Sequence, residues 1–227
     1  MALVTAVGFA GIDAIREPHH PTILASVPAH RHVLVEVRLN DRFLDDELLR
    51  VFLDRLQPLH GKLGPVMFQF EYLNRAKMPS VNVFLDRLDT FFAQVPGGFQ
   101  YAVEIRNPNW LAPAFFAFLT ERKLGYVFLD GYFMPPVGEV WARWQPATAD
   151  FAVLRLHGPD RAEIEKQTGS RWDRITAPKP EGLAVAAKII RWNAQRRIRT
   201  YVNANNHYEG CAPLTIEGLL AELARER

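Results

Sequence analysis

Apolar runs typical of β-strands alternate with helix-like runs along most of this chain of 227 residues, and this alternation limits its fold more than any other feature. The apolar runs lack the outward polar positions of a strand that is exposed on one face. A strand followed by a helix, repeated, requires a parallel sheet with helical crossovers. The predicted strands are HVLVEVR (32–38), LGPVMFQF (63–70), FQYAVEI (99–105), GYVFLD (125–130), FAVLRLHG (151–158) and RTYVNANN (199–206).

The segments between these strands predict the helices that cover the sheet. Ser80 is a candidate N-cap for the helix after the second strand, and Thr215 is a candidate N-cap for the last helix. The polar stretch 159–179 is predicted to be a connection. No segment rich in Gly, Ser or Pro divides the chain, so we predict one α/β domain.

The overall composition is that of a folded globular protein, because 48% of the residues are hydrophobic and 23% are charged. A formal net charge of +2 is too small to indicate a nucleic-acid or anionic-membrane partner. No apolar run approaches 18 residues, and the first 20 residues carry no basic region of a secretory signal. We therefore expect a cytoplasmic protein, in which the single cysteine, Cys211, is a small buried residue.

Polar residues stand at the ends of all the predicted strands. The carboxyl ends of parallel strands lie on one face of a sheet, and ligands bind there in open sheets and in barrels. Burying an ionised group costs several kcal/mol unless it is paired, so a core does not require these residues. We predict that they converge on one polar pocket. The candidates are Glu36, Arg38, Gln69, Glu104, Arg106, Asp130, Arg155, His157, Asn203, Asn205 and Asn206.

Three of these residues are the candidate catalytic groups. His157 has a side chain whose ordinary pKa lies near neutrality, so it suits a general acid or base. It could equally be a metal ligand or a hydrogen-bonded residue at the end of its strand. Asp130 could orient His157, hold a metal or pair with Arg155, and Glu104 is a second carboxylate at the same face.

The other candidates are expected to bind the substrate. Arg155 and His157 alternate on one strand and so share a face, where they would meet an anionic or hydroxyl group. Arg106 either pairs with Glu104 or binds a carboxylate or phosphate of the ligand. Trp110 is either a stacking surface or an aromatic residue packed under a loop.

The stretch NANNHYEG (203–210) is the densest polar segment of the chain. Asparagine forms turns readily, so some of Asn203, Asn205 and Asn206 are expected to shape the backbone, and the others to bind the ligand. His207 and Tyr208 follow directly, and we place them over the pocket.

No motif identifies a cofactor. The sequence has no H-E-x-x-H pattern and no paired cysteines, so a metal ion would require Glu104, Asp130 and His157 to meet in space. A glycine-rich phosphate loop is also missing from the sequence, since GKLGP (61–65) has neither the spacing nor a following helix.

Four segments resemble signature segments of the domain of unknown function 72 family, the YecE-like proteins. They are LGPVMFQF, YAVEIRNPNW, TADFAVLRLHG and VNANNHYEGCAPLTI, and the likeness runs from about residue 23 to residue 227 in the same order. Known members have a TIM-barrel-like fold. The resemblance implies such a β/α barrel domain over residues 23–227 and points to no particular reaction.

The N-terminal part departs from this pattern. Family members begin with a segment of the type Gly-Thr-Ser-Gly-Trp, and their second strand ends in an Asn-Ser-x-Phe-Tyr type of motif. Neither is found here, so residues 1–22 form an atypical segment and the family's first two strands are missing. We therefore expect an incomplete barrel of about six to seven β/α units, whether the chain is a natural short form, a shortened gene product or an expressed fragment.

An incomplete barrel leaves backbone groups uncovered at the strands that flank the gap, 32–38 and 199–206. Each unpaired buried group costs about 1–3 kcal/mol, so a cover is expected. The segment ALVTAVGF (2–9) is the candidate cover, with self-association as the second possibility.

Two function classes follow. The first is an enzyme, a hydrolase, lyase or isomerase, that acts on a small anionic or polyhydroxylated substrate by acid/base chemistry. The second is a non-catalytic ligand-binding or assembly module that has lost part of the barrel. Fold alone does not choose between them.

Overall fold

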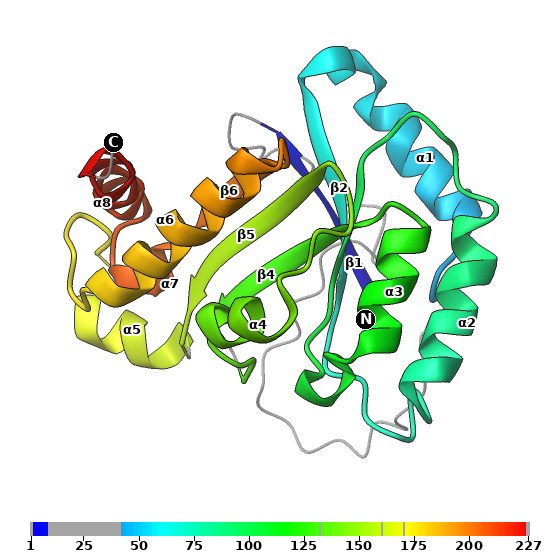
Figure 1. The fold of residues 1–227 in the computed structure, drawn as a ribbon, viewed down its shortest axis with the longest axis horizontal. Helices are drawn as coiled ribbons and strands as arrows, with labels where there is room; N and C mark the ends of the chain where they lie inside the picture. Colours follow the sequence, from blue (N-terminus) through cyan, green and yellow to red (C-terminus); the bar gives the residue numbers. More distant parts are fainter. Residues whose placement is uncertain (1, 9–41, 132, 160, 170, 226–227) are drawn as a thin grey trace. The chain divides into compact units, whose positions relative to one another are not determined.

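The computed structural model describes residues 2–8, 42–131, 133–159, 161–169 and 171–225 (Figure 1). The described chain divides into two compact units, Met1–Tyr101 and Ala102–Arg227. The predicted strand at 32–38, with Glu36 and Arg38, lies outside the described residues and stays a prediction.

The first unit contains a strand pair and two helices. Strand β1 (Ala2–Gly8) runs antiparallel to β2 (Leu63–Phe70), with Ala2 opposite Phe70 and Gly8 opposite Leu63. Helix α1 (Asp46–Leu56) and the 3-10 helix η1 (Gln57–Lys62) precede β2, and α2 (Val81–Phe92) follows it. The predicted strand within residues 2–9 is therefore confirmed, with β2 as its partner. Its direction departs from an all-parallel sheet, because antiparallel pairing satisfies the backbone groups of β2 equally well.

Local sequence explains the helix starts and the core of this unit. The Asp45 side chain accepts a hydrogen bond from the Leu48 N–H at the start of α1. Ser80 accepts from the Val83 N–H at the start of α2, as predicted. Aromatic rings from β2 and α2 then pack edge to face, with Phe70 and Phe84 at 4.9 Å between ring centroids.

The second unit contains parallel strands connected by helices. Its strands are β3 (Tyr101–Glu104, from Ala102 onward), β4 (Gly125–Gly131), β5 (Phe151–Gly158) and β6 (Arg199–Ala204). They are neighbours in chain order and pair in parallel. The helical segments are η2 (Pro108–Trp110), α3 (Pro113–Glu121), α4 (Val137–Trp144), α5 (Arg161–Thr168), α6 (Pro180–Gln195), α7 (Asn206–Glu209) and α8 (Ala212–Arg225).

Strand β5 lies between β4 and β6 and forms the centre of the unit's core. Leu154 is opposite Phe128 on one side and Val202 on the other. Helix α6 runs alongside β6, and α4 and α8 pack against α6 (Figure 1). Phe128, Val153 and Leu154 are fully buried, which explains why these strands carry no outward polar alternation.

Two expectations for the connections are wrong. The stretch 159–179 contains α5, because Arg161–Thr168 is composed mainly of good helix formers and is anchored by the buried Ile164. Thr215 does not cap the last helix, since α8 already begins at Ala212 and the Thr215 N–H donates to the Cys211 carbonyl. At the true start, the Asn206 side chain accepts from the Ala212 N–H at 2.8 Å.

The chain has an α/β, TIM-barrel-like fold that is incomplete. Strand and helix alternate as expected, and the described residues form six strands where a full barrel has eight. Among these residues, no helix combines the length and the apolar character needed to cross a bilayer.

Candidate functional site

Strand β5 presents two polar side chains at its carboxyl end. Arg155 and His157 are the only residues of this strand that are not buried. They alternate with the buried Leu156 and Gly158, so both point to the same face of the sheet. The sequence-based prediction that they share a face is confirmed.

A buried carboxylate pairs with Arg155 from the neighbouring part of the unit. Glu104 at the end of β3 has no exposed surface, and its Oε2 accepts a hydrogen bond from Arg155 Nη1. Its Oε1 faces Arg106 Nε at 3.4 Å. The side chains of Arg106 and Arg155 remain 19% and 17% exposed. Two guanidinium groups thus contact one carboxylate, and we call Glu104, Arg106 and Arg155 the arginine cluster.

A cavity of about 290 Å³ opens beside this cluster. Arg155 and Asn203 are paired across β5 and β6 and both contribute to its wall. The Nδ2 atom of Asn203 is buried and has no hydrogen-bond partner within the described part of the chain. An unpaired buried donor is costly, so this amide suits an acceptor on a ligand. The lining residues are Arg155, Leu156, His157, Asn203, Ala204, Asn205, Asn206 and Ala212.

Two of the three predicted asparagines also shape the backbone around the cavity. Asn205 accepts from the His207 N–H at 3.0 Å and donates its own backbone N–H to the Leu156 carbonyl at 2.9 Å. Asn206 accepts from the Ala212 N–H. The Oδ1 atoms of Asn205 and Asn206 therefore already accept hydrogen bonds from the backbone. The Asn203 amide is the strongest candidate of the three for donating a hydrogen bond to a ligand.

The position of α7 depends on a glycine at the end of β5. Gly158 has a φ of +90°, and a Cβ there would collide with the backbone of His207 and Tyr208. The missing side chain lets α7 lie directly against β5. His207 consequently faces His157, with 6.5 Å between the ring centroids.

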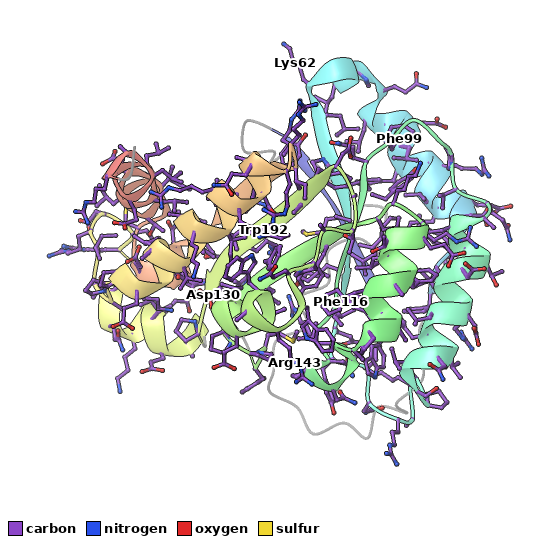
Figure 2. All side chains as sticks on the ribbon, in the orientation of Figure 1. Lys62, Phe99, Phe116, Asp130, Arg143 and Trp192 are labelled. Carbon is purple, nitrogen blue, oxygen red and sulfur yellow. The ribbon has the colours of Figure 1, made fainter. Side chains whose placement is uncertain are left out.

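Asp130 lies at the end of β4 (Figure 2). It binds a different partner from those expected. Its Oδ2 accepts a hydrogen bond of 2.9 Å from the hydroxyl of Tyr208, which has no exposed surface. Lys179 Nζ lies 4.4 Å from the centre of the Tyr208 ring, and Glu209 accepts from the Lys179 N–H at 2.7 Å. We call Asp130, Lys179, Tyr208 and Glu209 the tyrosine cluster.

Burial and charge in the tyrosine cluster act on its titratable groups. Burial and the Asp130 charge raise the pKa of Tyr208 above its usual value, so its hydroxyl remains a donor. Burial lowers the pKa of Lys179, while the carboxylates of Asp130 and Glu209 oppose this change. Sequence reasoning missed Lys179 and Glu209, because nothing in their spacing shows that they meet at Tyr208.

The electrostatic setting of His157 favours its neutral form. Burial is the largest cause, and the positive charges of Arg155, Arg106 and His207 add to it. Together they lower the pKa of His157 from 6.5 to about 4. At neutral pH this imidazole is therefore uncharged and can accept a proton.

The remaining predicted residues are placed as follows. Gln69 lies in β2 of the first unit and is half-buried. Trp110 in η2 is only 4% exposed, which agrees with packing under a loop. Tyr208 is buried rather than set over the cavity, and Cys211 is buried as predicted.

The residues needed for a metal site do not come together. Asp130 binds Tyr208, and Glu104 binds the two arginines. Across the residues that the structure describes, no group of three or more His, Cys, Asp or Glu side chains could hold a metal ion.

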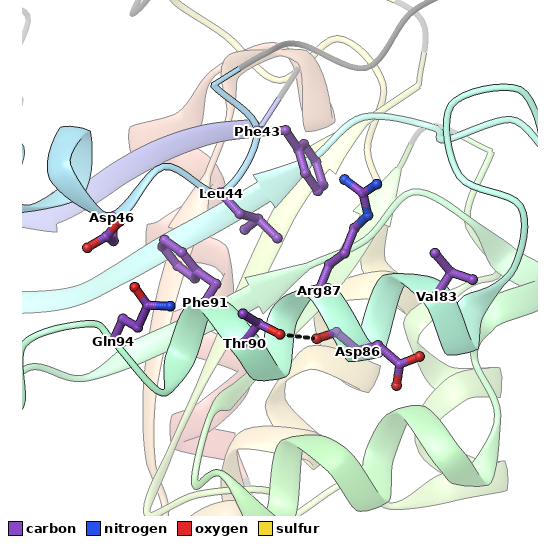
Figure 3. A pocket seen from close by; sticks show the side chains of 9 residues that line it. All are labelled: Phe43, Leu44, Asp46, Val83, Asp86, Arg87, Thr90, Phe91 and Gln94. Carbon is purple, nitrogen blue, oxygen red and sulfur yellow. Dashed lines mark hydrogen bonds between the residues drawn. The ribbon is translucent and has the colours of Figure 1, made fainter.

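The first unit has a cavity of its own, of about 340 Å³, between the start of α1 and α2 (Figure 3). Its wall mixes apolar and charged side chains, and the Thr90 hydroxyl on α2 donates within its own helix to the Asp86 carbonyl. No histidine lines it, and no side-chain ion pair joins its lining residues to one another. The lining residues are Phe43, Leu44, Asp46, Val83, Asp86, Arg87, Thr90, Phe91 and Gln94.

The second unit contributes to an incomplete TIM-barrel-like α/β fold, and Arg155, His157 and Asn203 line a cavity at the carboxyl ends of its parallel strands. Comparison with known families is specific: residues 17–227 match the model described as "Protein of unknown function DUF72". The chain belongs to this family, and the resemblance of its four segments is confirmed.

Solved structures of the same family share the fold. A DUF72 family protein from Thermotoga maritima MSB8 has a TM-score of 0.56 and 23% identity, with 80% of this chain and 66% of that chain covered. A DUF72 family protein from Enterococcus faecalis V583 has a TM-score of 0.58 and 19% identity, with 81% and 67% covered. The chain thus spans just under two thirds of the Thermotoga protein's length. No match was found among curated proteins.

Proposed function

We propose that the protein is an enzyme that binds a small anionic or polyhydroxylated substrate in the cavity of the second unit, with His157 as the group that accepts a proton. One observation carries this proposal. The two side chains of β5 that are not buried, Arg155 and His157, both line the same cavity as the unpartnered Asn203 amide.

The charge of the site favours an anion. Among the described residues, two guanidinium groups share the single carboxylate of Glu104. Arg155 brings its guanidinium group to the cavity wall. A guanidinium group matches the geometry of carboxylate and phosphate oxygens, and the Asn203 amide adds a directional donor for a hydroxyl or anionic oxygen.

The roles of the two carboxylates follow from their contacts. Glu104 is enclosed and bound to both arginines, so we assign it to positioning Arg106 and Arg155. Asp130 is bound to Tyr208, so we assign it to the stability of the fold around α7 rather than to substrate binding. In this proposal His157 exchanges protons with the substrate. A bound anion next to His157 would offset the nearby cations and raise its pKa towards neutrality, where a general base is most effective.

The second candidate is a non-catalytic ligand-binding or assembly module. This candidate is favoured by the hydrogen bond from Tyr208 to Asp130, because a carboxylate bound to Tyr208 does not orient His157. Such a module would bind the same anions as the enzyme and would turn over none of them.

Thermal unfolding with a panel of ligands tests the binding step. Phosphate, sulfate, sugar phosphates and hydroxy acids are added at millimolar concentration and pH 7. A ligand at ten times its Kd should raise the Tm by about 3–6 °C. Arg155→Lys and His157→Gln should reduce the response at least threefold, while Arg225→Gln on the surface of α8 is the matched control. Equal responses from all four proteins would contradict the proposal, and binding without product formation would select the module.

Self-association is a separate proposal. Strand β6 has β5 as its one neighbour among the described strands, and none of its residues is buried. We propose that a second copy covers this edge. Light scattering on a concentration series should show a dimer mass, and a variant lacking residues 1–20 should associate further. A constant monomer mass for both proteins would reject this idea.

A further inference from the structure

Three aromatic rings form a row that begins at the cavity wall. His157 lies on β5, and His207 on α7 follows at 6.5 Å between ring centroids. Trp172, in the connection between α5 and α6, meets the His207 ring edge to face at 5.2 Å. His207 and Trp172 are only partly buried, so solvent and small molecules reach this row.

The backbone fixes the separation of the two imidazoles. Asn205 accepts the His207 N–H and donates its own N–H to the Leu156 carbonyl on β5. Gly158 allows the backbone of α7 to touch the strand directly after His157. Because α7 is tied to β5 at these points, the distance between the rings does not depend on flexible connecting segments. The edge contact with Trp172 restricts the remaining rotation of the His207 ring.

The surroundings of the two imidazoles differ. His157 has a buried Nδ1 and lies next to Arg155 and Arg106, whereas His207 packs against the uncharged Trp172. The charge of His207 itself disfavours protonation of His157. A proton on one ring therefore disfavours a proton on the other, and such a pair can divide the roles of acid and base.

We propose that His207 is the second proton-transfer residue of this cavity and acts as the acid that complements His157, on a small anionic substrate that carries a hydroxyl group. This inference rests on the proposed function. Neutral His157 accepts the proton of the substrate hydroxyl as its oxygen forms a new bond to the reacting atom, and protonated His207 donates a proton to the oxygen whose bond to that atom breaks. One proton enters and one leaves the substrate, so the charge moves from His207 to His157, and exchange with water restores both rings.

Histidine-selective NMR of the full chain gives the first test. The side-chain signals of His157 and His207 are titrated with pH in the wild type and in His207→Gln. Removing a charge at this distance should raise the pKa of His157 by about 0.5–1. An unchanged pKa of His157 in His207→Gln would show that the two rings do not influence each other's protonation, and that result would overturn the inference.

Inorganic phosphate is the probe for the second test. At pH 7 both ring signals should shift with one common Kd, and His207→Gln should weaken that Kd about 3- to 10-fold. If neither ring responds to phosphate, the proposed function fails and this inference fails with it. If His157 responds alone and the Kd of His207→Gln is that of the wild type, only this inference fails.

Trp172→Ala provides an independent check in case His207→Gln does not fold. It frees the His207 ring without removing a charge, so the phosphate-induced shift of His207 should fall at least about threefold, with a smaller loss for Trp172→Phe. Arg225→Gln, on the surface of α8, should match the wild type in every measurement. A Trp172→Ala protein whose His207 responds like the wild type would show that the ring row has no role in binding.

Discussion

The second unit has two polar clusters at strand ends, and they differ in their access to the cavity. In the arginine cluster, a buried carboxylate pairs with two cations, and one of them lines the cavity. In the tyrosine cluster, the Asp130 carboxylate is closed off by the hydroxyl of the fully buried Tyr208. The comparison shows that a polar residue at a strand end can contact a ligand only when its partners hold it at a cavity wall and do not enclose it.

The largest effect is expected at Gly158, where α7 lies against the end of β5. Gly158→Ala places a Cβ against the backbone of His207 and Tyr208, at a φ of +90° that alanine adopts poorly. We expect a loss of about 3–5 kcal/mol in the free energy of unfolding, measured by urea denaturation. Gly97→Ala is the control, since a Cβ there meets nothing within 4 Å. Similar losses for both variants would show that α7 does not depend on this close approach.

Glu104→Gln should come next, because it keeps the shape of the side chain and removes the charge between Arg106 and Arg155. Breaking a buried ion pair typically costs about 3 kcal/mol, and the partial exposure of both arginines sets this figure at the lower end of the range. Chemical denaturation measures the loss. Glu222→Gln removes the carboxylate that pairs with the exposed Arg225 and should cost less than about 0.5 kcal/mol. A Glu104→Gln protein as stable as this control would remove the basis of the arginine cluster.

Tyr208→Phe tests whether the tyrosine cluster contributes to ligand binding. It deletes the hydroxyl that donates to Asp130 and leaves the cavity wall intact, so stability should fall by about 1.5–3 kcal/mol. Phosphate affinity, measured by calorimetry, should stay within about twofold of the wild type. Tyr72→Phe, at a side chain that is 60% exposed, is the control. A large loss of phosphate affinity in Tyr208→Phe would show that the tyrosine cluster belongs to the binding site.

The smallest effect concerns the pH dependence that His157 adds. Its pKa is about 4 in the folded protein and 6.5 ordinarily, so folding favours the neutral form. The stability it contributes is complete above pH 6.5 and is lost as the pH falls towards 4. After allowance for its partial exposure, His157→Gln should reduce the acid-induced loss of stability between pH 7 and pH 4 by about 1 kcal/mol.

Denaturation curves at both pH values, compared with Arg225→Gln, test this last prediction. Parallel losses for the wild type and His157→Gln would mean that the surroundings of His157 are more open than the arginine cluster suggests.

The strand pattern and the β5 pair were predictable because both depend on local periodicity. The sequence predicted FAVLRLHG as a strand with Arg155 and His157 on one face, and β5 spans the same eight residues with these two side chains unburied. The N-cap at Ser80 was equally predictable, since one side chain and the next turn suffice to form it. Thr215 was misjudged because Asn206, six residues before Ala212, supplies the bond at the start of α8.

The sequence by itself determined the alternation of strand and helix, the family, and the set of polar residues at the strand ends, because each follows from residues close together in the chain. Only the tertiary structure decided which of them pair. Arg155 and Glu104 are 51 residues apart, and Tyr208 and Asp130 are 78 apart. These partners meet because of the way the strands and α7 pack, and α7 can approach β5 only because residue 158 is a glycine. The sequence therefore does not show which polar residues line the cavity and which are closed off by a partner.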